Sequence, residues 1–360
     1  MSAAAADSAR PGLTLLDRAA LADVTRGGLV LAGGAGQGPH TALLTELMCH
    51  VLGPAGAVPV VPARDLPGDA WVAHVALRGS PLALSELPPS GLELSEAARA
   101  LAAHRGVELT AVAGAQVGGM NVVAGALAAH DLGLPVVDGD LAGRSFPGLA
   151  QLLLGGTRPV SGPVALQDPR GNAALVECGS ITTCERLVEA GCAGLGGWVA
   201  MALCLVRAGD LARDGVGGSL TRAWRIGRAL APPVVLDPAR LVAATGGEVV
   251  FRGTITEARR SAAPARPWAI ALEAGTGEVA RVDAREQFLA AAVNGRPVAT
   301  TPDVICLLTD AGTVVDVDTL RPGLTVSIAR FTLDPRWYSP AALTHIGPAA
   351  LGIGPAAAFT

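Results

Sequence analysis

The stretch LPVVDGDLAGRSFP, residues 134–147, joins a short apolar run to a turn that carries charge. Its first four residues, Leu134–Val137, are typical of a buried strand, which ends where Asp138 and Asp140 begin. In open α/β sheets the ligand crevice lies at the carboxyl ends of the strands, so two carboxylates followed by Arg144 are placed to meet a polar ligand. The alternative is a solvated turn in which Asp140 caps the segment that follows.

Two further glycine-rich turns follow apolar runs in the first half of the chain. GGAGQGPH, residues 33–40, lies between Leu29–Ala32, which we predict as a strand, and a helix predicted over Thr41–Leu52. GAQVGGMN is residues 114–121. Backbone N–H groups at such turns can bind an anion or a ring carbonyl, although a tight turn without a ligand is the alternative. We therefore expect the turns at 33–40, 114–121 and 138–146 to converge on one pocket.

Composition limits the chemistry that is open to the chain. Half of the 360 residues are hydrophobic, and all 27 basic residues are arginine, which excludes a lysine Schiff base and the lysine of a P-loop. A net charge of −4 without a dense basic block argues against nucleic acid as a partner, and scattered arginines that can bind carboxylates favour small acidic molecules. The glycine spacing does not match the GxGxxG fingerprint of a dinucleotide oxidoreductase.

The cysteines and the N-terminus predict a protein of the reducing cytoplasm. The six cysteines form no CxxC pair, and no basic start precedes an apolar run at the N-terminus, so we expect buried thiols and no secretion signal. One uncharged run, Ala190–Val206, is at the short limit for a membrane span and contains four glycines. We expect no membrane partner and assign this run to a helix over Thr183–Ala208, in the core or in a homo-oligomer interface.

Changes in sequence pattern along the chain predict an α/β protein. We assign residues 1–12 to a disordered tip, 13–170 to a layered α/β domain that carries the site on glycine-rich strand–helix turns, and 171–245 to a helical segment that could form an oligomer interface. From 246 to 360, short β-type runs broken by Gly, Pro and Asn predict a mostly β C-terminal domain.

Six sequence blocks occur in order along the chain. They are GGAGQG (33–38), QVGGMN (116–121), LPVVDGDLAGRSFP (134–147), TRAWRIGRAL (221–230), PDVICLLTDAGTVV (302–315) and IGPAALG (346–352). Together they resemble the S-methyl thiohydantoin desulfurase family, once known only as a domain of unknown function and often discussed beside hydantoinases and oxoprolinases. The aspartate-rich turn and Pro302–Asp303 are the most specific parts of a resemblance that covers nearly the whole chain. It implies an α/β N-terminal domain, a C-terminal domain richer in β structure, and hydrolytic removal of a sulfur substituent from a five-membered ring similar to hydantoin.

The chain departs from this family pattern in two turns. In the first turn, where the pattern runs from glycines to an acidic residue, this chain has Gln37-Gly38-Pro39-His40. In the second turn, where glutamate usually precedes the paired glycines, it has Gln116. If that glutamate is a general base or a metal ligand in relatives, Gln116 cannot take a proton at neutral pH and is a weak ligand. The departures leave an altered substrate, altered chemistry or lost catalysis as outcomes.

The first functional hypothesis is an enzyme of this hydrolytic kind. Asp138 or Asp140 acts as base, their proximity separates the two pKa values, and His40 replaces the missing acidic function. Backbone N–H groups of the first turn stabilise the developing anion, Arg144 binds a substrate carboxylate, and Asn121 bonds the ring. The predicted substrate-binding residues are Gly34, Gly36, Gly38, Gln116, Gly119, Asn121 and Arg144. Replacement of Asp140 by Asn would then abolish turnover and leave the fold intact.

Two alternatives belong to other classes. One is a metal-assisted hydrolase of cyclic amides in which Asp138, Asp140 and His40 bind a divalent metal, although no HxH, HExxH or paired-cysteine spacing supports it. The other is a homologue that binds or modifies a related small heterocycle in the same pocket after catalysis has been altered. No cofactor other than such a metal is expected.

Overall fold

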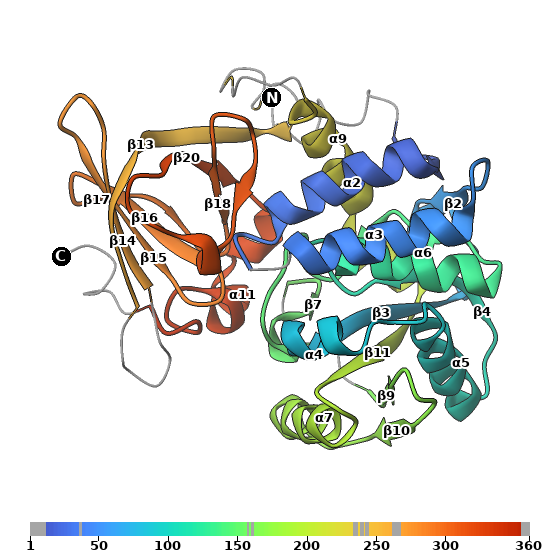
Figure 1. The fold of residues 1–360 in the computed structure, drawn as a ribbon. Helices are drawn as coiled ribbons and strands as arrows, with labels where there is room; N and C mark the ends of the chain where they lie inside the picture. Colours follow the sequence, from blue (N-terminus) through green and yellow to red (C-terminus); the bar gives the residue numbers. More distant parts are fainter. Residues whose placement is uncertain are drawn as a thin grey trace.

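Two eight-stranded sheets, one in the N-terminal and one in the C-terminal domain, organise the protein (Figure 1). The computed structural model describes residues 12–35, 38–156, 158–159, 162–232, 237, 241, 245–260 and 268–353. The first sheet is mixed and is covered by helices, whereas the second is antiparallel. This confirms the predicted fold class, a layered α/β N-terminal domain followed by a mostly β C-terminal domain.

The sheet of the N-terminal domain has a parallel centre. In spatial order its strands are β1 (Leu15–Leu16), β2 (Val58–Val61), β5 (Val136–Val137), β4 (Leu109–Gly114), β3 (Trp71–Gly79), β11 (Trp198–Arg207), β9 (Val164–Gln167) and β10 (Ala173–Val176). Strands β2, β5, β4 and β3 pair in parallel, and the remaining pairs are antiparallel. The carboxyl ends of the parallel strands therefore lie along one edge, which is where ligands bind in such sheets.

Helices cover both sides of this sheet. They are α2 (Arg18–Leu31), α3 (Gly38–Leu52), α4 (Pro81–Glu86), α5 (Glu93–Arg105), α6 (Asn121–Leu132), α7 (Ile181–Gly194), α8 (Ala208–Asp214) and α9 (Ser219–Ala229). Helices α3 and α6 lie on one side of β3 and β11, and α7 lies on the other (Figure 1). Two short ladders complete the domain: β6 (Gly139–Asp140) with β12 (Val216–Gly217), and β7 (Leu153–Leu154) with β8 (Arg158–Pro159).

The C-terminal domain is built on the second sheet. In spatial order its strands are β17 (Arg296–Thr300), β16 (Phe288–Val293), β15 (Val279–Ala284), β14 (Trp268–Glu273), β13 (Gly247–Arg260), β20 (Thr325–Phe331), β18 (Val304–Leu308) and β19 (Val314–Val315). Helix α11 (Pro340–Ile346) follows the last strand. One hydrophobic cluster lies within this domain and includes Ile270 and Val326.

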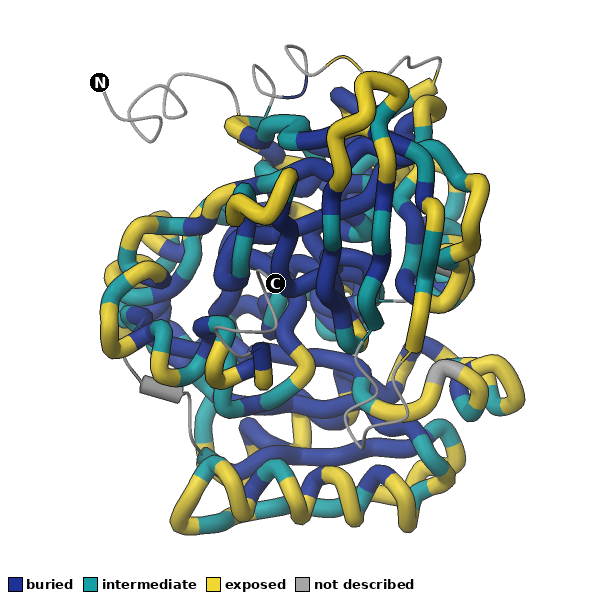
Figure 2. The backbone as a smooth tube through the Cα atoms, turned by 90° about the vertical axis from the view of Figure 1, so that its left-hand side faces the viewer, coloured by how far each residue is buried: buried dark blue, intermediate teal, exposed yellow. Residues whose placement is uncertain are grey.

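A second, larger hydrophobic cluster extends across both domains. It includes Val112 and Val199 of the first sheet together with Val304 and Phe331 of the second. Figure 2 shows the buried residues concentrated in the central strands, with exposed residues along the outer helix faces and the loops. Because apolar side chains of the two domains pack in one cluster, separating the domains would expose buried apolar surface to water.

The prediction of a strand over Leu29–Ala32 was wrong. Helix α2 continues through Gly27 to Leu31 and packs against α9. A Cβ atom on Gly27 would lie 1.8 Å from the carbonyl oxygen of Ala223, and one on Gly227 would lie 1.8 Å from that of Asp23. Glycine is therefore present here because it lets two helix backbones touch, and the helix does not end at it.

The prediction of a helix over Thr183–Ala208 was wrong in its second half. Helix α7 ends before Gly196 and Gly197, whose φ values of +103° and +95° are incompatible with a continued helix. Strand β11 follows and pairs with β3 and β9 in the middle of the sheet. A strand buried on both faces has a continuous apolar sequence, which explains the part of the run Ala190–Val206 that lies in β11; residues 190–194 are the end of α7. Within the described part of the chain, no helix combines the length and apolar character of a membrane span.

Candidate functional site

The three glycine-bearing turns meet beside the carboxyl ends of β4 and β5. The N–H of Gly119 donates to the carbonyl of Gly28 (2.8 Å), and the N–H of Ser145 donates to the carbonyl of Leu31 (3.1 Å). These bonds join the second and third turns to the C-terminal part of α2, from which the first turn leads. The turns predicted to converge are therefore close together.

Gln116 joins the second turn to the third through both ends of its amide. Its Oε1 accepts a hydrogen bond from the N–H of Phe146 (2.7 Å), and its Nε2 donates to the carbonyl of Phe146 (3.3 Å). A glutamate could accept the first bond but could not donate the second at neutral pH. The amide thus suits a structural clamp between the turns, and this is a physical reason for glutamine at this position.

A cleft of about 670 Å³ opens where these turns face the C-terminal domain. This volume lies within the range of about 300–1,000 Å³ that is common for small-molecule sites. Ala35, the end of β3, helix α7 and the Glu286–Gln287 loop contribute to its walls. Its polar side chains belong to Arg78, Gln116, Asn121, Ser145, Gln151, Glu185, Glu189, Glu286 and Gln287. The cleft therefore combines hydrogen-bonding groups with carboxylates and one guanidinium.

Arg78 supplies the positive charge of the cleft wall from the end of β3. Its Nη2 lies 2.7 Å from the carboxylate of Glu189 and 3.8 Å from that of Glu185, both on α7. Its Nη1 donates to the carbonyl of Pro147 at 3.3 Å. The guanidinium thus links β3, α7 and the third turn, and it holds two carboxylates at the cleft.

Asn121, a predicted binding residue, begins helix α6 and reaches strand β3 with its side chain. It is 4% exposed, and its Oδ1 accepts a hydrogen bond from the N–H of Leu77 (3.1 Å) in β3. It also lines the cleft. Because the side-chain oxygen of Asn121 accepts this hydrogen bond from β3, the amide nitrogen is the group that can donate to a ligand.

Asp138 caps helix α9. It is 8% exposed, and its two oxygens accept hydrogen bonds from the N–H (3.0 Å) and the hydroxyl (2.6 Å) of Thr221, which lies in the first turn of α9. Burial raises the pKa of Asp138, and the bonds from Thr221 oppose that rise. A carboxylate at a helix N-terminus satisfies N–H groups that would otherwise lack partners. Asp138 does not line the cleft.

Asp140 closes its own turn. Its Oδ1 accepts hydrogen bonds from the N–H groups of Ala142 (3.2 Å) and Gly143 (2.8 Å). Burial raises the pKa of Asp140 to about 7, against the lowering effect of these N–H groups. The cause is burial and not the repulsion between carboxylates that we expected from the sequence. Asp140 does not line the cleft, and the geometry matches the alternative in which it caps the turn.

Arg144 joins the two domains. We expected it to bind a substrate carboxylate, but it does not line the cleft. The side chain is fully buried, and its Nη1 donates to the carbonyls of Pro302 (3.2 Å) and Asp303. Its Nη2 donates to Oε1 of Gln287 (3.1 Å), and its Nε donates to the carbonyl of Ser145 (3.1 Å). Burial lowers the pKa of Arg144 to about 10, so the guanidinium stays charged at neutral pH.

The first turn contacts the C-terminal domain through its glycines. The carbonyls of Gly33 and Gly34 accept hydrogen bonds from the N–H groups of Phe288 (2.8 Å) and Val317 (3.0 Å). Both glycines have positive φ, and a Cβ atom on Gly34 would lie 2.2 Å from the ring of Phe288. These bonds make the turn part of the domain junction.

Of the other predicted site residues, His40 and Gly119 do not line the cleft. Nε2 of His40, on α3, lies 3.1 Å from the hydroxyl of Ser85 on α4. Gly38 begins α3, Gly119 closes the second turn at a φ of +59°, and Gly36 lies outside the described residues. In the ranges that the structure describes, no group of three or more His, Cys, Asp and Glu side chains is arranged to hold a metal ion. Asp138, Asp140 and His40 therefore do not form the predicted ligand set.

Two family models match the chain in sequence. The model described as "S-Me-THD-like, N-terminal domain" matches residues 19–178, and "S-Me-THD-like, C-terminal domain" matches residues 180–357. The chain belongs to the S-Me-THD-like family. This confirms the resemblance to the S-methyl thiohydantoin desulfurase family, whereas our domain boundaries within the chain stay predictions.

The fold of this S-Me-THD-like protein is similar to a known crystal structure. An X-ray structure of a protein from Chromobacterium violaceum matches with a TM-score of 0.79 and covers 95% of this chain and 99% of its own. At 22% identity this similarity shows the fold alone. A search of curated proteins returned no match.

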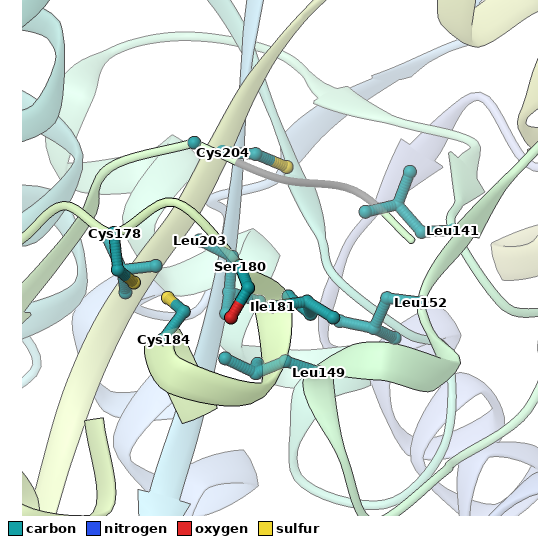
Figure 3. A pocket seen from close by; sticks show the side chains of 11 residues that line it. Leu141, Leu149, Leu152, Cys178, Ser180, Ile181, Cys184, Leu203 and Cys204 are labelled. Atoms are coloured by element: carbon teal, nitrogen blue, oxygen red, sulfur yellow. The ribbon is translucent and has the colours of Figure 1, made fainter. Parts of the chain in front are cut away.

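A second cavity of this S-Me-THD-like protein, beside α7, is lined by thiols (Figure 3). Its volume of about 20 Å³ is roughly that needed for one water molecule. Cys178, Cys184 and Cys204 line it among aliphatic side chains. Burial raises the pKa of Cys184 and of Cys204 to about 12, so these thiols stay protonated at neutral pH. Protonated thiols are poor nucleophiles, and this cavity is a weaker candidate site than the cleft.

Several cleft residues of the S-Me-THD-like protein were missed in the sequence. Arg78 follows an apolar strand, as Asp138 does, so the same rule about strand ends could have identified it. Glu185 and Glu189 are four residues apart on α7, and side chains at this spacing point from the same face of a helix. Glu286 comes from the other domain, and no local pattern connects it to the turns.

Proposed function

We propose that this S-Me-THD-like protein is a hydrolase-type enzyme that removes a sulfur substituent from the ring carbon of a small heterocycle related to hydantoin. The observation that carries the proposal is the family match over both domains, because it makes a thiohydantoin-related function the best-supported one. The cleft between the turns and the C-terminal domain is the proposed substrate site.

The lining of the cleft suits a ring of this kind. Such a ring has flat apolar faces and a polar edge of carbonyl and N–H groups. Phe146 and Leu149 supply apolar surface, and the side chains of Asn121, Ser145 and Gln287 supply donors and acceptors. These five residues come from both domains, so a bound ring would contact the junction.

The proposed reaction is a hydrolysis. A water oxygen bonds to the ring carbon that carries sulfur, and the carbon–sulfur bond then breaks. Of the two protons of the water, one leaves on the thiol and the other stays on the ring nitrogen, while the ring gains a carbonyl. The step needs a group that accepts a proton from water. The carboxylates that line the cleft are Glu185, Glu189 and Glu286, so we place the base among them. The competing assignment is Asp138 or Asp140, the two bases expected from the sequence.

The experiment is an assay with an S-methyl thiohydantoin. We expect methanethiol, detected with a thiol reagent, and the matching hydantoin, detected by mass spectrometry, in equal amounts. The variants Glu185→Gln, Glu189→Gln and Glu286→Gln are compared with Asp140→Asn. Loss of turnover in one of the glutamate variants alone supports the cleft assignment, and the absence of product from the wild-type chain refutes the proposed reaction.

A second candidate is a homologue that binds the heterocycle without turnover. The observation in its favour is Gln116, an amide hydrogen-bonded to Phe146 at the position where the family resemblance implies glutamate. Calorimetry that shows tight binding of an S-methyl thiohydantoin, together with no release of methanethiol, would support this candidate over the enzyme.

A further inference from the structure

We propose that the hydroxyl of Ser145 binds the polar edge of the heterocycle at the floor of the cleft. This inference deepens the proposed function and rests on it. It makes Ser145 a binding residue, which our sequence analysis did not assign.

The first argument is the burial of a hydroxyl without a partner. Ser145 is 1% exposed, and its Oγ makes no hydrogen bond to any residue that the structure describes. A buried hydroxyl in this state is less stable than a bonded one, because it has lost its hydrogen bonds to water without replacing them. Most buried polar groups in native proteins are bonded, so this hydroxyl calls for a specific partner. A ligand atom in the adjoining cleft can be that partner.

The second argument is that the protein holds the backbone of Ser145 on two sides. Its N–H donates to the carbonyl of Leu31 (3.1 Å), and its carbonyl accepts from Nε of Arg144 (3.1 Å). Because Arg144 also bonds the C-terminal domain, the position of Ser145 is set by the domain junction. Because the backbone of Ser145 is already held in place, binding a ligand would cost little conformational entropy at this residue.

The third argument is the close approach of Gly118. A Cβ atom on Gly118 would lie 2.2 Å from the Oγ of Ser145, so any larger residue at position 118 would collide with the hydroxyl. Glycine leaves the space that the hydroxyl occupies. The second turn closes this side of the hydroxyl, and Ser145 is one of the residues that line the cleft.

The cleft distinguishes Ser145 from other buried groups without partners. In the described part of the chain, Oγ of Ser219 and both ring nitrogens of His74 also lack hydrogen bonds. Neither Ser219 nor His74 lines the cleft. Of these three residues, Ser145 alone has a hydroxyl without a partner and also lines the cleft. Its hydroxyl can donate to a ring carbonyl or accept from a ring N–H.

The test is calorimetric titration of hydantoin into the wild-type chain, Ser145→Ala and Ser219→Ala. We expect Ser145→Ala to weaken hydantoin binding about tenfold, since one hydrogen bond is lost. Ser219→Ala, which removes an equally buried hydroxyl outside the cleft, should bind as the wild type does. Both variants should melt at the wild-type temperature or above it, because each removes a hydroxyl without a partner.

Three results would overturn the inference. They are wild-type affinity in Ser145→Ala, a lower melting temperature in that variant that accounts for weaker binding, and no hydantoin binding to the wild type at millimolar concentration. If Ser145→Ala does not fold, a wild-type crystal soaked with hydantoin decides by the distance from Oγ to the nearest ring oxygen or nitrogen. Binding without methanethiol release from an S-methyl thiohydantoin refutes the proposed reaction and leaves this inference standing.

Discussion

The raised pKa of Asp140 predicts how the stability of the protein changes with pH. Burial raises this pKa from 3.8 to about 7, so between these values the folded chain keeps a proton that the unfolded chain has lost. The protonated Asp140 therefore contributes to the free energy of unfolding in full below about pH 4. This contribution is lost as the pH rises to about 7. One pKa unit corresponds to about 1.4 kcal/mol, so the free energy of unfolding should fall by up to about 3 kcal/mol between pH 5 and pH 8 from this group alone.

The variant Asp140→Asn isolates this contribution. The amide oxygen can still accept from the N–H groups of Ala142 and Gly143, but the side chain no longer titrates. Urea unfolding followed by circular dichroism gives the difference in unfolding free energy between variant and wild type at each pH. This difference should shift by about 2–3 kcal/mol in favour of the variant from pH 5 to pH 8. In this difference, the pH-dependent contributions of other titrating groups cancel. One such group is His74, because burial lowers its pKa to about 4.

A matched control is Asp310→Asn on the surface. The ion pair with Arg252 lowers the pKa of Asp310, so this carboxylate stays ionised from pH 5 to pH 8 and the difference for this variant should be constant. A difference for Asp140→Asn that is equally constant would refute the reasoning about burial. Because Asp140 does not line the cleft, we also expect the variant to keep turnover; its loss would favour the catalytic role expected from the sequence.

Three further substitutions test the packing around the site. Asp138→Ala removes the cap of α9 and should lower the free energy of unfolding by about 2–4 kcal/mol, whereas Asp138→Asn, which keeps an acceptor, should cost less than half of this in the same urea experiment. Gly27→Ala places a Cβ 1.8 Å from the carbonyl of Ala223 and should cost about 3 kcal/mol or more, visible as a lower melting temperature. Arg144→Met leaves buried carbonyls at the domain junction without donors; we expect a loss of about 3–5 kcal/mol and unfolding curves from fluorescence and circular dichroism that no longer coincide.

The sequence predicted those features of the fold that depend on local patterns. Glycine turns after apolar runs located the strand ends at 114 and 138, and alternating β-type runs identified the C-terminal domain. Glycine was misleading where its role depends on a distant partner. Gly27 faces Ala223 of α9, and no residue near Gly27 in the sequence indicates that contact.

The position of the candidate site could be predicted from the sequence, but the side chains that line it could not. The rule that ligands bind at strand ends located the convergence of the turns. It could not show that the carboxylate of Asp138 points to Thr221, which is 83 residues away. Three of the hydrogen bonds of Arg144 go to the other domain, so its use as a link between domains is set by tertiary structure alone. The cleft instead takes its carboxylates from α7 and from Glu286.

The most direct test of the central claim is a crystal structure of the protein with hydantoin. The account predicts ring density in the cleft between Gln116, Asn121, Ser145 and Gln287, with a polar ring atom within about 3.2 Å of the hydroxyl of Ser145. Ring density in the cavity lined by Cys184 and Cys204, or against the turn of Asp138 and Asp140 with the cleft empty, would contradict it.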